Sequence, residues 1–184
     1  MRTLFLAAAL TAILLSAAGC GEKKATPPQE LPKEKKALPL HICDTVYNAV
    51  DTLPVTVMVN AETGMTVPDS VTMKLRYQAY RGTLNIAAID TGAGVVKAQT
   101  DLMMQRLGQN AAEQLRITSA GGYRTTILVA TSPVAVPVQF LAVGNSKILS
   151  GYFAFDSEPE ETDSLLPVID ALRRDMIFAA ENFK

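Results

Sequence analysis

Hydrophobic and polar residues alternate along several short stretches of the chain, as they do in strands that bury one face. Six stretches show this alternation, at residues 55–60, 71–78, 83–89, 123–130, 136–143 and 147–155. Residues 79–82 and 144–146 join neighbouring stretches and have the length and composition of hairpin turns. Pro133 and Pro137 flank the fifth stretch and indicate either an edge strand or the point where a strand begins. The pattern therefore predicts a sheet.

Two longer segments repeat their apolar positions every three or four residues, which is the spacing of a helix with one buried face. The first covers residues 95–115 and the second covers roughly residues 164–181. Gly108 lies inside the first segment, where it costs about 1 kcal/mol relative to alanine and indicates a kink or a close contact. Strands, helix, strands and helix, joined by hairpin-length loops, predict the α+β class: a mainly antiparallel sheet with two long helices packed on it.

The first twenty residues have the three parts of a secretory signal. Arg2 supplies the positive region, residues 4–15 are apolar, and small residues precede Cys20. The apolar run is shorter than the ~20 residues that a membrane-spanning helix needs. The sequence from Leu15 to Cys20 resembles the lipobox of bacterial lipoproteins, although Ala17 replaces the usual leucine. We therefore expect a signal peptide at residues 1–19 and lipidation of Cys20 with acyl chains such as palmitate; a plain secretory signal with a chance cysteine is the alternative. Gly21, in place of an aspartate, favours the outer membrane.

Residues 20–40 predict a flexible linker that carries the lipid. Four prolines prevent a regular helix there, and five lysines with three glutamates keep the segment solvated. Residues 41–184 carry eleven basic and fifteen acidic side chains and are long enough for one globular α+β domain. Because this domain is mildly acidic, it lacks the basic footprint of a nucleic-acid-binding protein, and nucleic acid is not an expected partner.

Candidate chemistry is sparse along the chain. His41 is the single histidine, and with Cys43 it supplies two ligands where zinc needs three or four, even with Asp44 adjacent. If residues 41–43 were extended as a strand, His41 and Cys43 would point to one face. With Cys20 lipidated, Cys43 has no partner within the chain for a disulfide, and we expect it to pack in the core; pairing with another protein is the alternative.

Three further motifs match known sites only in part. Residues 92–94 lack the third glycine of a dinucleotide-binding loop and the lysine of a P-loop. Residues 119–122 lack the order of a nucleophile elbow, and the acidic residues 158–163 lack calcium-loop spacing. We therefore predict no catalytic residue, no metal site and no cofactor, and the chain is not expected to be an enzyme.

Several stretches of the folded region resemble the GldD family of gliding-motility lipoproteins of Bacteroidota. They include residues 138–141, 145–146, 151–155 and 163–169, and the order of the paired strands at 71–90 and the following helix also agrees. The family often carries tryptophan, whereas this chain has none. The resemblance covers about residues 40–184 and implies a periplasm-facing outer-membrane lipoprotein connected with gliding and type IX protein secretion, with no catalytic residues. The order of sheet and helices is also similar to that of PsbP-like α-β-α modules, which are generally scaffolding domains.

Together these observations predict a non-enzymatic accessory or assembly lipoprotein. The lipid on Cys20 attaches it to the membrane, and the surface of the domain docks other envelope proteins, such as gliding or secretion components. The alternative is a small-ligand-binding lipoprotein with a pocket between sheet and helices, which would require a deep cavity with convergent polar groups. A hydrolase is the third reading, and it would depend on His41 because no other histidine is present.

Overall fold

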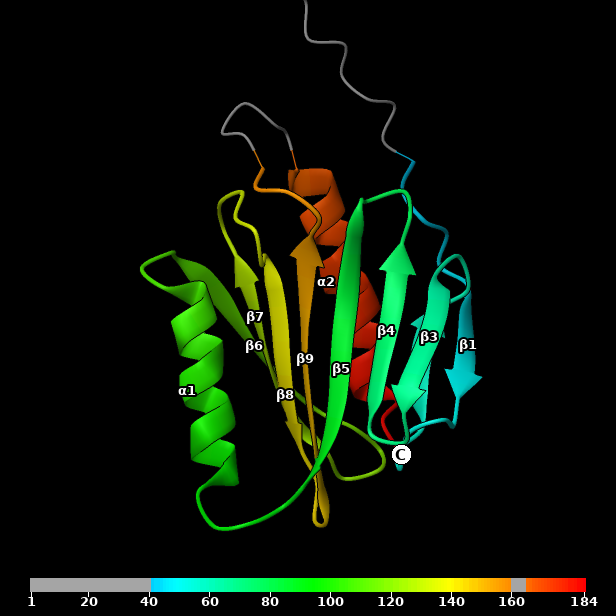
Figure 1. Ribbon diagram of the computed structural model, residues 1–184, viewed down its shortest axis with the longest axis vertical. Helices are drawn as coiled ribbons and strands as arrows, with labels where there is room; N and C mark the ends of the chain where they lie inside the picture. Colours follow the sequence, from blue (N-terminus) through cyan, green and yellow to red (C-terminus); the bar gives the residue numbers. More distant parts are fainter. Residues whose placement is uncertain (1–40, 160–164) are drawn as a thin grey trace, which may run out of the picture. The chain divides into compact units, whose positions relative to one another are not determined.

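The computed structural model describes residues 41–159 and 165–184 (Figure 1). The predicted lipidation site Cys20, the signal peptide and the linker lie outside the described residues, as do residues 160–164. The elements follow in chain order: β1 Tyr47–Val50, β2 Val57–Asn60, β3 Gly64–Asp69, β4 Thr72–Tyr77, β5 Gly82–Asp90, α1 Val95–Leu107, β6 Ala112–Thr118, β7 Arg124–Ala130, β8 Val138–Val143, β9 Lys147–Phe155 and α2 Leu166–Glu181.

A seven-stranded sheet forms the centre of the domain, and all of its neighbouring strands are antiparallel. Its order is β3-β4-β5-β9-β8-β7-β6, so two meanders, β3–β5 and β6–β9, meet where β5 pairs with β9. Helix α1 connects them, because it carries the chain from β5 to the far edge of the sheet at β6. The predicted α+β class and the mainly antiparallel sheet are therefore confirmed.

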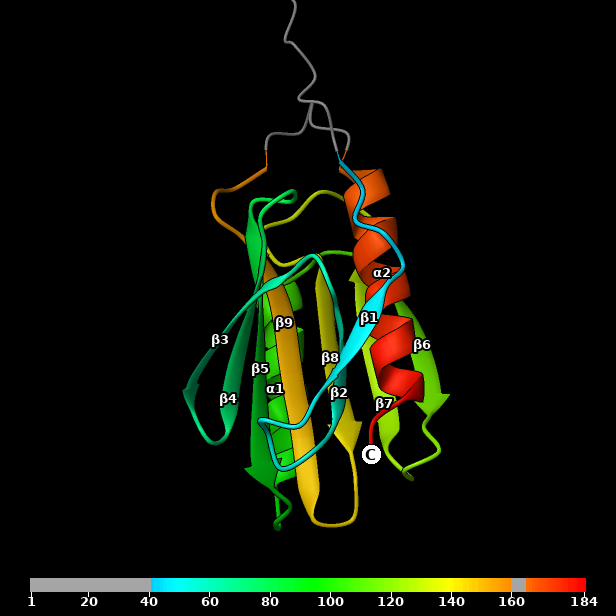
Figure 2. The same cartoon turned by 90° about the vertical axis from the view of Figure 1, so that its right-hand side faces the viewer.

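The two helices cover opposite faces of this sheet. Alternate residues of β8 show this directly: Phe140 packs in the core that contains α2, whereas Leu141 packs with Met103 of α1. The β1–β2 ribbon lies on the α2 side, with Val57 and Val59 in the same core (Figure 2). The α2 side thus has a helix and a ribbon over the sheet, and the α1 side has one helix.

Most of the predicted elements are confirmed, with shifts of one or two residues at their ends. The expected strand 147–155 is β9, and the expected helix 164–181 is α2 from Leu166. Pro137 directly precedes β8, so these prolines mark the point where a strand begins. The alternative of an edge strand is wrong, because β8 lies between β9 and β7. None of the helices within the described residues is long and apolar enough to cross a bilayer.

The prediction of one helix over 95–115 is wrong beyond residue 107. Gly108 takes φ +62° with ψ −126°, and its N–H donates to the Met104 carbonyl, so the helix ends there instead of bending. Asn110 closes the end with its side-chain amide on the Leu107 carbonyl at 2.8 Å. The next residues form β6, whose Leu115 and Ile117 face the core with the two-residue period of a strand. Leu115 also fitted the helical spacing, which concealed this edge strand.

Two other strands, β1 and β3, have no counterpart among the predicted ones. β3 is an edge strand, and its register shifts between Thr66 and Asp69, around Pro68. Most of its residues are exposed, so the apolar alternation that indicates a half-buried strand is weak there.

Candidate functional site

The point of greatest functional interest is residues 41–46, here called the entry segment, which follow the predicted linker directly in the sequence. Glu62, directly after β2, holds its first part: its Oε2 lies 2.7 Å from His41 Nε2, and its Oε1 accepts the Asp44 N–H at 2.6 Å. Asn60 Nδ2 donates to the Asp44 carbonyl at 2.8 Å. The Ala61 N–H also donates to the Val46 carbonyl at 2.8 Å, so the entry segment is fixed largely through its backbone.

Cys43 lies in the middle of the entry segment and is held from two sides. Its N–H donates to the Tyr80 hydroxyl at 2.9 Å, and its carbonyl accepts from Arg174 Nη2 of α2 at 3.1 Å. The thiol side chain is only 4% exposed and packs in the core, as expected from the sequence. Burial raises the pKa of the Cys43 thiol, so this group is poorly suited to act as a nucleophile.

Asp175 of α2 is the centre of a buried polar network that continues from the entry segment. Its Oδ1 accepts from the Tyr47 hydroxyl of β1 at 2.8 Å, and its Oδ2 accepts from Asn60 Nδ2 and the Tyr77 hydroxyl, each at 3.3 Å. Arg174 Nη2 lies 3.6 Å from Oδ1. We refer to Tyr47, Asn60, Tyr77, Arg174 and Asp175 as the Asp175 network. It connects β1, β2, β4 and α2 at one place.

Burial governs the electrostatics of this network. Desolvation raises the pKa of Asp175, and the hydrogen bond from Tyr47 and the charge of Arg174 oppose that rise. Desolvation also raises the pKa of Tyr47 and, far more strongly, that of Tyr77, with the Asp175 carboxylate adding to both shifts. The two hydroxyls therefore stay protonated and serve as hydrogen-bond donors. The network orients backbone and side chains, and it offers no exposed acid, base or nucleophile.

The predicted candidate residues do not meet at one place. His41 is exposed and paired with Glu62, whereas Cys43 is buried against Tyr80, so the two side chains do not share a face. Residues 41–46 include no strand, which explains the difference from the expected alternation. Within the described residues, no cluster of three or more His, Cys, Asp or Glu side chains has metal-binding geometry.

The remaining motifs have structural positions. Gly94 takes φ +78° just before α1, where residues 92–94 turn the chain into the helix. Ser119 donates its hydroxyl to the Phe183 carbonyl at 2.9 Å and holds the turn at 119–122 against the end of the chain. In the acidic stretch 158–163, residues 160–163 lie outside the described part of the chain.

The space between the sheet and α2 is nearly filled. The cavity there has a volume of about 10 Å³, which is room for one water-sized sphere, and it lies beside Asn60, Tyr77 and Asp175. Small-molecule sites are commonly ~300–1,000 Å³, so this cavity is too small for an organic ligand.

The sequence-based reading missed Asp175 and its partners. A signal was present, because Asp175 lies three residues after Leu172 and one before Met176, within the apolar stripe of the last helix. A carboxylate at such a position is rarely buried without partners, so it pointed to a polar network on this face. No family model and no curated protein matches this chain.

Proposed function

We propose that the protein is a lipid-anchored, periplasm-facing accessory protein of the bacterial outer membrane, without catalytic activity of its own. The observation that carries the proposal is Cys20, placed at the end of an apolar signal and followed by the proline-rich linker. Its role is to hold a docking domain at the membrane, in the manner of GldD-like components of gliding motility and type IX secretion.

The entry segment supports this role. A tethered domain receives any pull from the membrane at the residue where the linker ends, which is the start of the entry segment. Hydrogen bonds between the backbone of that segment and the side chains of Tyr80, Asn60 and Arg174 fix it to a turn, to β2 and to α2. A force on the linker is thus distributed over several elements of the core and does not act on one strand alone.

A non-catalytic role is supported by the separation of the candidate reactive groups. His41 and Cys43, on which a hydrolase would depend, point to different surroundings, and the thiol is buried. The ligand-binding alternative loses support because the space between the sheet and α2 is so small.

Replacement of Cys20 by serine tests the proposal. In cells that process lipoproteins and are fed radiolabelled palmitate, the wild-type protein should take up label and sediment with outer membranes, whereas Cys20→Ser should be unlabelled and found in the soluble periplasmic fraction. Cys43→Ser is the matched control, because it removes the other cysteine and should leave labelling intact. Equal labelling or equal sedimentation of wild type and Cys20→Ser would overturn lipid anchoring.

The accessory role needs a separate readout. In a host with gliding or type IX secretion, deletion of the gene should impair surface movement or export, wild type should restore it, and Cys20→Ser should fail to restore it at equal protein level. Full restoration by the released variant would show that tethering is not required.

A further inference from the structure

The α1 side of the sheet is only partly covered among the described residues. In Figure 1, α1 lies over the β6–β8 half, and no helix lies in front of β3, β4 or β5. Met73, Leu75 and Tyr77 of β4 pack in the core on the α2 side, so their neighbours in the strand face the α1 side. We call the uncovered region the open strip. Lys74 and Arg76 of β4, Asn85 of β5 and Tyr152 of β9 belong to it, and Arg106 of α1 lies at its border.

Strand register places these residues in order. Lys74 is paired with Asn85, Asn85 with Tyr152, and Tyr152 with Gln139. Since neighbouring strands lie ~4.8 Å apart, Lys74 and Tyr152 are about 10 Å apart across the sheet. The Arg106 guanidinium of α1 lies 4.3 Å above the ring of Tyr152. Two cations from different elements thus flank the amide of Asn85.

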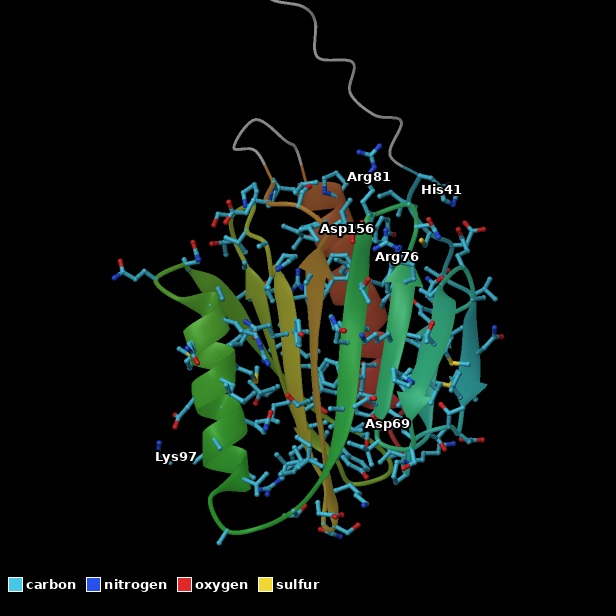
Figure 3. The ribbon with its side chains drawn as sticks, viewed as in Figure 1. His41, Asp69, Arg76, Arg81, Lys97 and Asp156 are labelled. Carbon is cyan, nitrogen blue, oxygen red and sulfur yellow. The ribbon has the colours of Figure 1, made fainter. Side chains whose placement is uncertain are left out.

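The charge of the open strip has the opposite sign to that of the domain. Lys74, Arg76 and Arg106 contribute three positive charges, and Asp156, which binds Arg76 at 2.5 Å, contributes one negative charge. Figure 3 shows Arg76 and Asp156 at the end of the sheet where Arg81 also lies. Residues 41–184 as a whole carry four more acidic than basic side chains.

Two polar atoms beside the open strip are buried without a partner among the described residues, Arg106 Nη1 and Gln139 Oε1. The Gln139 side chain is 1% exposed, and its Nε2 already donates to the Met103 carbonyl at 3.2 Å. Unpaired buried polar groups are costly, and more so when charged. Arg106 thus keeps hydrogen-bonding capacity that no described residue uses, at the border of the open strip.

We propose that the open strip is a docking surface for an acidic polypeptide segment of a partner protein. The positive charges of the open strip are complementary to acidic side chains of the partner. The position of α1 favours a polypeptide over a membrane as the partner. A helix with its side chains is ~10–12 Å across, so α1 stands above the sheet and would meet a flat bilayer before Lys74 or Asn85 could. A single helix or extended segment can lie beside α1 on β4, β5 and β9.

This inference rests on the proposed accessory role only in its choice of a protein partner, and it does not require the lipid. It is therefore tested on the full chain carrying Cys20→Ser, so that a failure of lipid anchoring cannot affect the result. The probe is a fluorescein-labelled peptide of about sixteen alternating Glu and Ala residues, ~24 Å long as a helix. A peptide with Gln in place of Glu is the probe control.

Fluorescence anisotropy at low salt should show binding of the Glu peptide, no comparable binding of the Gln peptide, and loss of affinity as salt screens the charges. Lys74→Glu combined with Arg106→Glu should weaken binding at least about tenfold, because like charges would then face the probe. The matched control is Arg124→Glu with Arg116→Glu, which makes the same charge change on β6 and β7, outside the open strip.

Thermal unfolding verifies that all variants fold, and the milder Lys74→Gln replaces the double variant if that one does not. The proposal is overturned if the Glu peptide does not bind, if the two peptides bind alike, or if the strip and control variants lose affinity equally. Binding to vesicles of anionic phosphatidylglycerol but not to the peptide, abolished by Lys74→Glu, would assign the surface to the membrane and also overturn it.

Discussion

The two helices of this domain have similar positions, one on each face of the sheet, and very different relations to it. Of the 16 residues of α2, eight are buried, including Leu172, Asp175 and Met176. Of the 13 residues of α1, only Met103 and Leu107 are buried. Helix α2 completes the core, whereas α1 connects two meanders and covers part of a face. The comparison teaches that α2 is part of the larger core, whereas α1 packs on the sheet through few buried residues of its own.

Most apolar residues of the two helices follow the same division, although Leu166 at the start of α2 is 54% exposed. Phe183, Leu172 and Val168 are 1% exposed on the α2 side. On α1, Leu102 is 40% and Met104 is 52% exposed. The exposed apolar groups of α1 contribute little to folding, because apolar surface stabilises the fold only when it is removed from water.

Truncation of a large core residue should have the largest effect on this comparison. Leu172→Ala in α2 should lower the free energy of unfolding by about 2–5 kcal/mol, because it removes buried methyl groups and leaves a cavity. Leu102→Ala in α1 makes the same chemical change at an exposed position and serves as the control, measured like the first by urea denaturation. Similar losses in the two variants would contradict the division between the helices.

Removal of the buried carboxylate should have the next largest effect. Asp175→Ala leaves the hydroxyls of Tyr47 and Tyr77 without their acceptor, and we expect a loss of about 1–3 kcal/mol in the free energy of unfolding. Asp170→Ala removes an exposed carboxylate from the same helix and should change stability by less than about 0.5 kcal/mol. An Asp175→Ala variant as stable as Asp170→Ala would show that the network does not stabilise the α2 side.

The pH dependence of stability should reveal Asp175 separately. Its pKa is raised in the folded state, so the folded protein binds more protons than the unfolded chain between the unfolded pKa of about 3.9 and the higher folded value. Its contribution to stability therefore falls as pH rises through this window. Denaturation across this range should show that fall in wild type and in the control Asp170→Asn, and its loss in Asp175→Asn.

Three exposed carboxylates act in the opposite direction and must be included in that comparison: Glu62, Asp156, and Asp69, whose pKa is lowered chiefly by the Val71 N–H. The pKa of Glu62 is lowered by the Asp44 N–H and by His41, and that of Asp156 is lowered by Arg76. Their contributions are present above the unfolded pKa values and are lost as pH falls. For this reason the difference between the Asp175→Asn and Asp170→Asn curves is the quantity to measure, and an identical pair of curves would contradict the assignment to Asp175.

The smallest effect is expected for Leu102→Ala itself, less than about 0.5 kcal/mol. Native-state hydrogen exchange sharpens the result: amides in the middle of α1 should exchange through local opening at lower free energy than those of α2, since few buried contacts hold α1. Equal protection of the two helices would contradict this.

How much the sequence revealed depended on how each element buries its residues. β9 was predictable to its ends because both of its neighbours are strands and its apolar residues are buried. β6 was not, because Leu115 fits both a helical and a strand period, and only Gly108 marked the end of α1. The entry segment was beyond prediction, because its partners Asn60, Tyr80 and Arg174 are distant in sequence and hydrogen bonds to backbone leave no periodic trace.

The pairing of β5 with β9 affects how the chain folds while it is being made. Nine residue pairs join these strands, from Gly82 with Phe155 to Asp90 with Lys147. During synthesis the β3–β5 meander is made first, and its inner edge stays unpaired until α1, three further strands and then β9 have followed. An unpaired edge of this kind invites wrong pairing between chains, and such non-local closure is slow. Partly made chains should therefore aggregate most readily before β9 is available to pair, and chaperones should matter most in that interval.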